Sequence, residues 1–338
     1  MSKFSLEVLN RVVFPYFTAK DPDVILGASF GEDVALTQVG SDILVSHLDP
    51  IVGAVNRIGW LAVHVACNDI ATTGAPPRWV QILVLVPRKD DEALLERIMQ
   101  DIAQAAEEIG VAIIGGHTGY SENLSRPLVA VTALGTMSGR KPVLTKGAQP
   151  GDHILITKGI ALEGTAILAN DFAETAVKLG LTEKDLAEAK ELMAQVSVIP
   201  EAVVLGSAGA TAMHDVTRGG LLETLLEIAS LSDVKMSIDY DRIPIPAVAA
   251  RFAEAFQFDP LKMISSGTLV ATVSPANLAA AQQALREKEI LFGDIGKVGL
   301  GAGVEIKKGG EVLAYEEIRC EEDELARLWT VYAADSAG

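Results

Sequence analysis

Two aspartates lie at matched distances from a hairpin signal near the start of the chain. The β-rich runs Val34–Val39 and Ile43–Leu48 flank the turn residues Gly40–Asp42, which is typical of a β-hairpin. A three-residue turn would place Asp33 opposite Asp49, and a two-residue turn would shift this pairing by one residue. Carboxylates about 5 Å apart on facing strands repel each other. They would need a cation such as Mg²⁺, which prefers oxygen ligands; two solvated turn aspartates are the alternative.

A third carboxylate, Asp69, follows Asn68 near the end of the apolar run Arg57–Thr73, which predicts a helix. An anion near a helix C-terminus opposes the helix dipole, and an unpaired charge in a buried helix is costlier still. A residue that breaks a local rule in this way indicates function, so we expect Asp69 to belong to a metal or phosphate site. The alternative is that Asp69 accepts backbone N–H groups of the Thr72–Gly74 turn.

A glycine-rich segment follows the short apolar run Val111–Ile114. Its sequence is Gly115-Gly116-His117-Thr118-Gly119. Glycines allow a backbone to approach a phosphate closely with its N–H groups, and a threonine hydroxyl adds a donor. Gly-Gly pairs commonly serve only as turns, so this segment is a weak signal by itself.

A second polar segment connects a predicted strand to a predicted helix. It reads His214-Asp215-Val216-Thr217-Arg218-Gly219-Gly220. The glycines would expose the first N–H groups of the helix, which favour an anion. Arg218 offers a planar donor fork, and Asp215 could orient it or accept a proton from a substrate. A plain helix cap by Asp215 or Thr217 is the alternative.

The elements that must position these residues fall into two similar halves. In the first half, the patterns predict the hairpin, the Arg57–Thr73 helix and further elements at 79–86, 91–109, 111–114 and 128–137. A Gly/Pro/Lys-rich segment, Ser138–Gly151, predicts a linker. In the second half, the patterns predict strands at 153–158, 210–213, 234–240 and 268–273 and helices at 221–231, 247–256, 276–288 and 321–332. Mixed strands and helices in two halves predict an α+β or α/β chain with two domains.

Composition limits the function classes. The 338 residues are 49% hydrophobic and carry a net charge of −17, which excludes disorder and gives no general footprint for nucleic acid or an anionic membrane. No apolar run is long enough for a membrane span, and the first residues lack the pattern of a signal peptide. The two cysteines, Cys67 and Cys320, form no disulfide framework. We therefore expect a cytoplasmic protein.

In combination, these motifs resemble those of the superfamily that contains aminoimidazole ribonucleotide (AIR) synthetase, PurM, and the hydrogenase-maturation protein HypE. The superfamily also includes selenophosphate synthetase and thiamine-monophosphate kinase. The segments that carry the resemblance, in chain order, are Gly31-Glu32-Asp33-Val34-Ala35, Leu48-Asp49, Asn68-Asp69-Ile70-Ala71 with Gly74-Ala75-Pro76, Gly115-Gly116-His117-Thr118, and Asp215-Val216-Thr217-Arg218-Gly219-Gly220. The HypE branch is the most similar.

The resemblance implies a two-domain α+β fold of the PurM type. The N-terminal domain, about residues 1–140, would bind ATP and contribute a mixed sheet to a β-barrel shared by a homodimer. An α/β domain at 148–320 and a C-terminal helix and tail at 321–338 would follow. The implied activity is ATP-dependent phosphorylation of a small-molecule substrate, typically at an amide-like oxygen.

The same resemblance implies roles for individual residues. It implies that Mg²⁺ is bound by Asp33, Asp49 and Asp69. It implies that the nucleotide or its phosphates are contacted by Gly31, Asn68, Gly115, Gly116, His117, Thr118 and Thr217. The catalytic positions on the substrate side are Asp215 and Arg218.

The chain also departs from these relatives. HypE acts through a cysteine at its extreme C-terminus, whereas Cys320 is followed by 18 further residues that end in Gly338, so we do not expect dehydration of a group on its own tail. Glu32 stands where the first aspartate of the Gly-Asp-Asp segment is usual, and no cysteine precedes Cys67 as in selenophosphate synthetases. A non-catalytic nucleotide-binding accessory protein is the alternative function.

Overall fold

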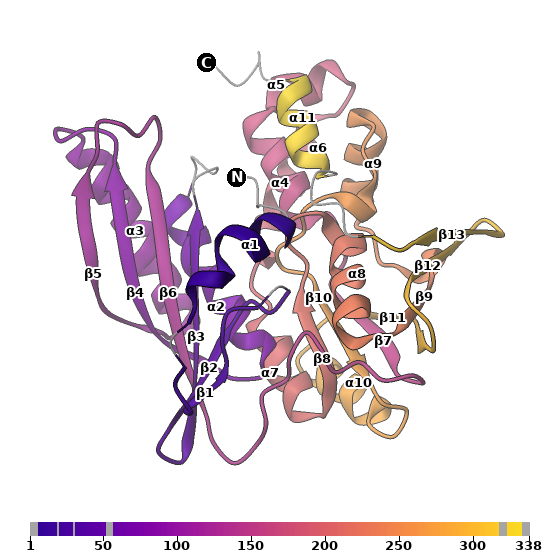
Figure 1. Ribbon diagram of the computed structural model, residues 1–338. Coiled ribbons are helices and arrows are strands. Elements are labelled where there is room, and N and C mark those ends of the chain that lie inside the picture. Colours follow the sequence, from indigo (N-terminus) through magenta and orange to yellow (C-terminus); the bar gives the residue numbers. More distant parts are fainter. Residues whose placement is uncertain (1–5, 19, 30, 52–56, 318–322, 333–338) are drawn as a thin grey trace. The chain divides into compact units, whose positions relative to one another are not determined.

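The structure, a computed structural model, describes residues 6–18, 20–29, 31–51, 57–317 and 323–332. The chain divides into two compact units, Met1–Pro142 and Val143–Gly338. Each unit combines one mixed β-sheet with α-helices, shown in indigo to purple for the first and pink to yellow for the second (Figure 1). The predicted two-domain α+β fold is therefore confirmed. No helix within the described ranges has the length and apolarity needed to cross a membrane.

The described part of the first unit contains a six-stranded sheet with the order β1-β2-β3-β6-β4-β5. Its strands, in chain order, are β1 Val24–Leu26, β2 Ala35–Val39, β3 Asp42–Ile51, β4 Pro77–Val86, β5 Ala112–Tyr120 and β6 Leu128–Met137. Strands β4 and β5 are parallel, and the other neighbours are antiparallel. Strands β1 and β5 therefore form the two edges of this sheet.

The β2–β3 hairpin has the shorter of the two turns that the sequence allows. Val39 pairs with Asp42, so only Gly40 and Ser41 form the turn, and Gly40 adopts a φ of 61° that glycine tolerates without strain. The predicted pairing of Asp33 with Asp49 is therefore wrong, because this register would place Asp33 opposite Leu48. A shift of one residue exchanges the faces of a strand, so these two carboxylates are not cross-strand neighbours.

Two helices, α2 (Ile58–Thr72) and α3 (Glu92–Ile109), pack against each other, and α2 covers β3 and β6. Every residue of α2 from Ile58 to Ala71 is buried. Gly59 allows this close approach, since a Cβ atom there would lie 2.4 Å from the carbonyl oxygen of Ile98. Helix α3 begins at the cap residue Asp91 and ends at Gly110, which has a φ of 80°. Before the sheet, the chain forms α1 (Leu6–Val12) and the 3₁₀ turn η1 (Phe14–Tyr16).

The described part of the second unit contains a seven-stranded mixed sheet with the order β13-β12-β9-β11-β7-β10-β8. Its strands, in chain order, are β7 His153–Thr157, β8 Ala210–Asp215, β9 Lys235–Asp239, β10 Leu269–Val273, β11 Phe292–Gly299, β12 Gly303–Lys308 and β13 Glu311–Tyr315. Strands β9 and β12 are parallel. The central strands β7 and β10 are almost fully buried, as expected for strands that are covered on both faces.

The helices of the second unit, in chain order, are α4 Leu162–Asp171, α5 Ala173–Lys178, α6 Glu183–Glu191, α7 Ile199–Ser207, α8 Gly220–Ser232, α9 Ala247–Phe256, α10 Leu278–Glu287 and α11 Glu324–Val331. The 3₁₀ turns η2 Leu192–Gln195, η3 Tyr240–Arg242 and η4 Pro260–Lys262 lie between them. One apolar core joins α8 to the sheet, and a second joins α4, α5, α6, α9 and α11. The site residues of this unit lie where β7 and β8 lead into α4 and α8.

Candidate functional site

His47 connects two of the three aspartates that the sequence identifies as metal ligands. Its Nε2 atom lies 3.0 Å from Oδ2 of Asp69 in α2, and its Nδ1 atom contacts the backbone carbonyl oxygen of Asp33. The side chains of His47 and Asp69 are only 14% and 7% exposed. The structure thus brings together the segments of Asp33 and Asp69, which are 36 positions apart in the sequence.

The two contacts of His47 use both nitrogens of its ring. A carbonyl oxygen can only accept, so Nδ1 must donate its proton to Asp33. The other ring nitrogen, Nε2, faces the Asp69 carboxylate at 3.0 Å. His47 therefore joins the backbone of Asp33 to the side chain of Asp69 through its two ring nitrogens.

Asp49 shares the strand face of His47. Alternate residues of a strand point to the same side of a sheet, and His47 and Asp49 are two positions apart in β3 with no irregularity in the pairing around them. This face is the one on which α2 packs, because His47 contacts Asp69 there and Val45 is fully buried. The side chain of Asp49 therefore points to the same side of the sheet as Asp69.

Asn68 and Asp69 are both buried in the last turns of α2, where Asn68 is 0% and Asp69 5% exposed. The nearby hydroxyls bond elsewhere, because Thr72 donates to the backbone oxygen of Asp69 and Thr73 to that of Ile70. These bonds satisfy carbonyls at the helix end, and neither uses the Asp69 carboxylate. The carboxylate instead contacts His47, a residue that the sequence signals did not single out.

The glycine-rich segment of the first unit continues the strand that the short apolar run begins, and it does not form a turn. Gly115, Gly116, His117 and Thr118 belong to β5 and pair with β4. A Cβ atom at Gly116 would lie 1.9 Å from the carbonyl oxygen of Ile82, so glycine is required for this close pairing. Two strands separate β5 from β3 in the sheet, so about 14 Å lies between them at typical strand spacing. The structure therefore does not bring these residues to the aspartates within one unit.

Gly31 precedes the Asp33 segment and has a φ of 74°. Glycine adopts this left-handed conformation readily, and the half-buried residue begins the turn that leads into β2. Gly31 is the first residue of the Gly31-Glu32-Asp33 motif, and its left-handed backbone conformation explains why a glycine stands there.

In the second unit, Asp215 ends β8 and is fully buried. Within the described residues, neither of its carboxylate oxygens accepts a hydrogen bond. The imidazole of His214 lies 3.6 Å away through Nδ1, and its Nε2 atom lies 3.2 Å from Glu227. A buried carboxylate without a donor is costly in a purely structural role, which supports a functional role for Asp215.

The turn after β8 carries Thr217, Arg218 and Gly219, and Gly219 is the cap residue of α8 with a φ of 76°. No side chain of the turn itself caps α8. Instead, the backbone N–H of Gly219 donates to Oδ2 of Asp323 at 3.2 Å, and Nε of Arg218 lies 4.0 Å from the same oxygen. The half-buried Thr217 and Arg218 are partly open to solvent.

Glu163 in the first turn of α4 is a further buried acid that the sequence signals missed. Its side chain accepts the backbone N–H of Ser266 at 3.3 Å. Burial raises the pKa of Glu163, and the nearby carboxylates of Asp323 and Asp215 raise it further. The second unit thus collects buried acids around the turn that carries Arg218, namely Glu163, Asp215, Glu223 and Asp323.

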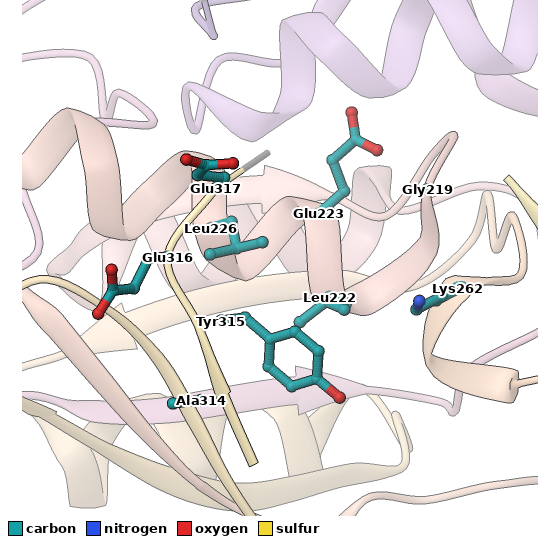
Figure 2. A pocket seen from close by; sticks show the side chains of 9 residues that line it. All are labelled: Gly219, Leu222, Glu223, Leu226, Lys262, Ala314, Tyr315, Glu316 and Glu317. Atoms are coloured by element: carbon teal, nitrogen blue, oxygen red, sulfur yellow. The ribbon is translucent and has the colours of Figure 1, made fainter. Parts of the chain in front are cut away.

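A cavity of about 570 Å³ opens beside this turn and is drawn in Figure 2. Leu222, Leu226 and Tyr315 supply its apolar surface. Its charged residues are Glu223, Lys262, Glu316 and Glu317. The volume lies within the range of small-molecule sites, and Gly219 of the turn forms part of the lining.

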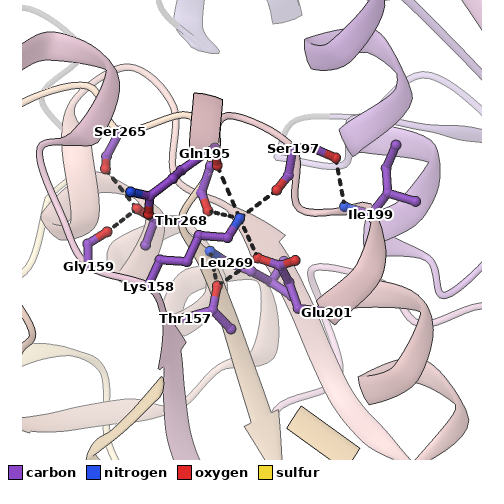
Figure 3. Close-up of polar contacts among 11 residues, drawn as sticks. Thr157, Lys158, Gly159, Gln195, Ser197, Ile199, Glu201, Ser265, Thr268 and Leu269 are labelled. Carbon is purple, nitrogen blue, oxygen red and sulfur yellow. Dashed lines mark hydrogen bonds and ion pairs between the residues drawn. The ribbon is translucent and has the colours of Figure 1, made fainter. Parts of the chain in front are cut away.

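A buried ion pair joins the loop after β7 to the segments that precede α7 and β10 (Figure 3). Nζ of Lys158 lies 2.7 Å from Oε1 of Glu201, and it also donates to the backbone oxygens of Gln195, Ser197 and Gly267. Burial lowers the pKa of Lys158, and Glu201 opposes this effect. Gly267 follows Ser266, the donor to Glu163, so this pair braces the loop that contacts Glu163.

The residues of the first unit suit a hard divalent cation. Asp33, Asp49 and Asp69 offer carboxylate oxygens, which Mg²⁺ prefers, and Asp69 is a buried acid at the unfavourable end of a helix dipole. Its contact with an imidazole resembles the outer partners that orient metal ligands. Carboxylate oxygen is thus the ligand type that the implied metal prefers, and Asp49 and Asp69 point to the same side of the sheet.

Comparison with known families identifies the class of this chain. Residues 31–137 match the N-terminal domain and residues 149–308 match the C-terminal domain of AIR synthase related proteins. The chain belongs to this family, and the resemblance inferred from its motifs is confirmed.

Individual relatives are similar over most of the chain. It is 29% identical over 294 residues to a putative hydrogenase expression/formation protein of Methanocaldococcus jannaschii, and this match covers 84% of each protein. It is 31% identical over 240 residues to the carbamoyl dehydratase HypE of Rhizobium leguminosarum bv. viciae, which covers 70% of this chain and just under two thirds (66%) of that HypE.

Solved structures share the fold. HypE in complex with ATP has a TM-score of 0.68 and 24% identity, and the match covers 93% of this chain and 95% of HypE. ThiL complexed with AMPPCP and TMP has a TM-score of 0.73 and 18% identity, and the match covers 93% of this chain and 98% of ThiL. At these identities the similarity establishes the fold.

Proposed function

We propose that this protein is an ATP- and Mg²⁺-dependent enzyme that phosphorylates an amide-like or other oxygen of a small-molecule substrate. In this reaction the bond between the γ-phosphorus and the β,γ-bridging oxygen breaks, a bond from phosphorus to the substrate oxygen forms, and ADP leaves. Family membership supports ATP use, since one relative by fold was solved with ATP and another with AMPPCP.

The observation that carries the proposal is the His47 bridge in the first unit. It joins the Asp33 segment to the buried Asp69 carboxylate, and Asp49 lies on the same strand face. We assign Mg²⁺ ligation to Asp33, Asp49 and Asp69, with Asn68 and Gly31 beside them as nucleotide contacts. Bound Mg²⁺ would offset the negative charge of the phosphate oxygens, which an acidic chain cannot do alone. His47 would orient Asp69 and limit its repulsion from the other acids.

In the second unit, we assign substrate contacts to the turn after β8. Arg218 offers a planar pair of donors to an oxygen that gains negative charge, and the Thr217 hydroxyl offers a further donor to phosphate. Asp215 would accept the proton that the substrate loses, because its buried carboxylate has free acceptor capacity within the described residues. Asp215 and Arg218 are the proposed catalytic residues.

We also propose that two copies associate through the sheet of the first unit. Strand β5 is an edge strand with eight of nine residues exposed, including Ile113 and Ile114, and Leu48 is 62% exposed on the sheet face away from α2. Exposed apolar strand surface of this kind is an interaction site or an aggregation hazard. A second copy could bring its own Gly115–Thr118 segment to the nucleotide, which one unit alone does not.

The experiment that tests the function measures ADP formation from ATP and Mg²⁺, with and without a panel of primary amides. We expect turnover that depends on Mg²⁺ and increases with at least one amide, and that falls to a small residual rate in Arg218→Ala. Binding of Mg·ATP without turnover under any of these conditions would instead indicate an accessory nucleotide-binding protein. The association is tested by light scattering of wild type and Ile114→Asp, with Leu313→Asp on β13 as the matched control.

A further inference from the structure

The C-terminal helix places a carboxylate against the turn that carries Arg218. Helix α11 begins after Asp323, whose Oδ1 atom accepts the backbone N–H of Ala326 at 2.7 Å and so caps the helix. The second oxygen, Oδ2, has a different function, because it accepts the N–H of Gly219 at 3.2 Å and lies 4.0 Å from Nε of Arg218. Asp323 is only 5% exposed.

The helix that carries Asp323 is firmly packed on the second unit. Leu328 is fully buried, and the ring of Trp329 meets Phe172 edge to face at 4.8 Å between centroids. Tyr332 packs in the same manner on Phe256 at 5.6 Å. These apolar contacts hold α11 on the second unit independently of the contact between Asp323 and the turn.

The turn in return needs a partner of this kind. Gly219 stands at the start of α8, where backbone N–H groups have no partner inside the helix, and no side chain of the turn supplies a cap. The partial positive charge of the helix N-terminus favours a carboxylate, and the Arg218 guanidinium adds to it. A hydrogen bond to a charged group is stronger than one between neutral groups.

We infer that Asp323 is a positioning residue, which holds the Gly219 N–H and the Arg218 side chain in the orientation that faces the substrate. The substrate role of Arg218 rests on the proposed function. Gly219 also lines the 570 Å³ cavity, whose opposite lining includes Tyr315 of β13 and the neighbouring Glu316 (Figure 2). The C-terminal part of the chain thus shapes this cavity in two places: Tyr315 and Glu316 line it directly, and Asp323 holds the lining residue Gly219.

The two oxygens of Asp323 make the inference testable. Asp323→Asn keeps an oxygen for the α11 cap but turns an amide NH₂ group toward Gly219 and Arg218. The NH₂ group would then face the N–H donors of these two residues and could not accept from them. Asp323→Ser keeps a good cap residue and removes the second oxygen. Glu324→Gln is the matched control, because Glu324 anchors the same helix by accepting the N–H of Asp259 at 3.2 Å and, among the described residues, has no polar contact with the turn.

The first measurement is hydrogen–deuterium exchange of the peptide that contains Gly219. We expect exchange at the Gly219 amide to be faster by about tenfold or more in Asp323→Asn and Asp323→Ser, and unchanged in Glu324→Gln. The melting temperature and the exchange of α11 should match those of the control. If the Asn variant fails to fold, the Ser variant decides the result. Equal Gly219 exchange in the variants and the control would overturn the inference.

The second measurement separates this inference from the proposed function. Calorimetric binding of Mg·ATP tests the function, and we expect its affinity to be unchanged in Asp323→Asn. The rate of ADP formation should fall about tenfold, and Asp323→Asn should add nothing in a chain that already carries Arg218→Ala. Independent, additive losses would contradict a role through Arg218. Absence of Mg·ATP binding in wild type would remove the function, while the exchange result would still decide whether Asp323 fixes the turn.

Discussion

The Nε2 atom of His47 lies 3.0 Å from Oδ2 of Asp69, and this contact joins the central strand β3 to the buried helix α2 of the first unit. A buried carboxylate at the end of a helix needs a positive partner. The imidazole of His47 is the side chain that contacts this carboxylate, and through the carbonyl of Asp33 it also fixes the segment that leads into β2.

We predict that His47→Gln weakens Mg·ATP binding about tenfold, since loss of a partner that orients a metal ligand typically lowers metal affinity 10–100-fold. Calorimetric titration with Mg·ATP measures this change. His153→Gln is the matched control, because His153 contacts Asp294 at 2.8 Å in the second unit and should leave the affinity unchanged. Equal affinities in both variants would remove His47 from the site.

The sequence alone predicts the helices and buried strands of this chain well. The predicted strand Leu128–Met137 and helix Ala247–Phe256 are confirmed at both ends, and the predicted Arg57–Thr73 helix differs from α2 by one residue at each end. Apolar periodicity and glycine stops specify such elements locally. The terminal helix was predicted from position 321, whereas α11 begins after its cap residue Asp323.

Contacts between distant segments explain what the sequence did not reveal. The hairpin register depends on whether the turn has two or three residues. With the observed two-residue turn, the position opposite Asp33 is Leu48 and not Asp49. His47 lies two positions before Asp49 in a predicted strand, and this spacing places both side chains on one face. That spacing was the signal by which the sequence could have identified His47. The contact of Asp323 with Gly219 spans 104 positions, and no local pattern marks it.

The buried His64 should make the first unit less stable in mild acid. Burial lowers its pKa to about 4, against the opposing effect of Glu108. The unfolded chain, with an ordinary histidine pKa of about 6.5, then binds the proton first as the pH decreases. Stability should therefore fall by up to about 3 kcal/mol between pH 6.5 and pH 4.

Urea unfolding of wild type and His64→Gln across this pH range measures the effect. Carboxylates common to both proteins cancel in the difference, so the variant should lose the part of the pH dependence that is due to His64. Parallel curves for the two proteins would show that His64 is protonated equally in the folded and unfolded chains.

The Lys158–Glu201 pair should respond asymmetrically to substitution. Lys158→Met leaves the Glu201 carboxylate buried and uncompensated, which typically destabilises by roughly 3–5 kcal/mol. Adding Glu201→Gln removes that charge and should recover at least about 1 kcal/mol of the loss. Urea midpoints measure both changes. Lys184→Met, in an exposed pair with Glu188, is the control and should be close to neutral.

The two cysteines should differ in reactivity. Cys67 is fully buried in α2, and burial raises the pKa of its thiol to about 12, so it should react with a thiol reagent only after unfolding. Cys320 lies outside the described residues, and from the sequence we expect Cys320→Ser to leave ATP turnover intact. Counting labelled thiols before and after denaturation tests the first expectation. Complete loss of turnover in Cys320→Ser would instead indicate a mechanism that uses a thiol.

Calorimetric titration of Mg·ATP into wild type and Asp69→Asn tests the central claim most directly. Asp69→Asn keeps the size of the side chain and removes the charge that faces His47. We predict at least about tenfold weaker binding of Mg·ATP in the variant, and weak binding of ATP to wild type when EDTA removes the metal. Asp90→Asn, at an exposed position of the same unit, should bind like wild type. Unchanged affinity in Asp69→Asn would contradict the assignment of this aspartate to a metal–nucleotide site.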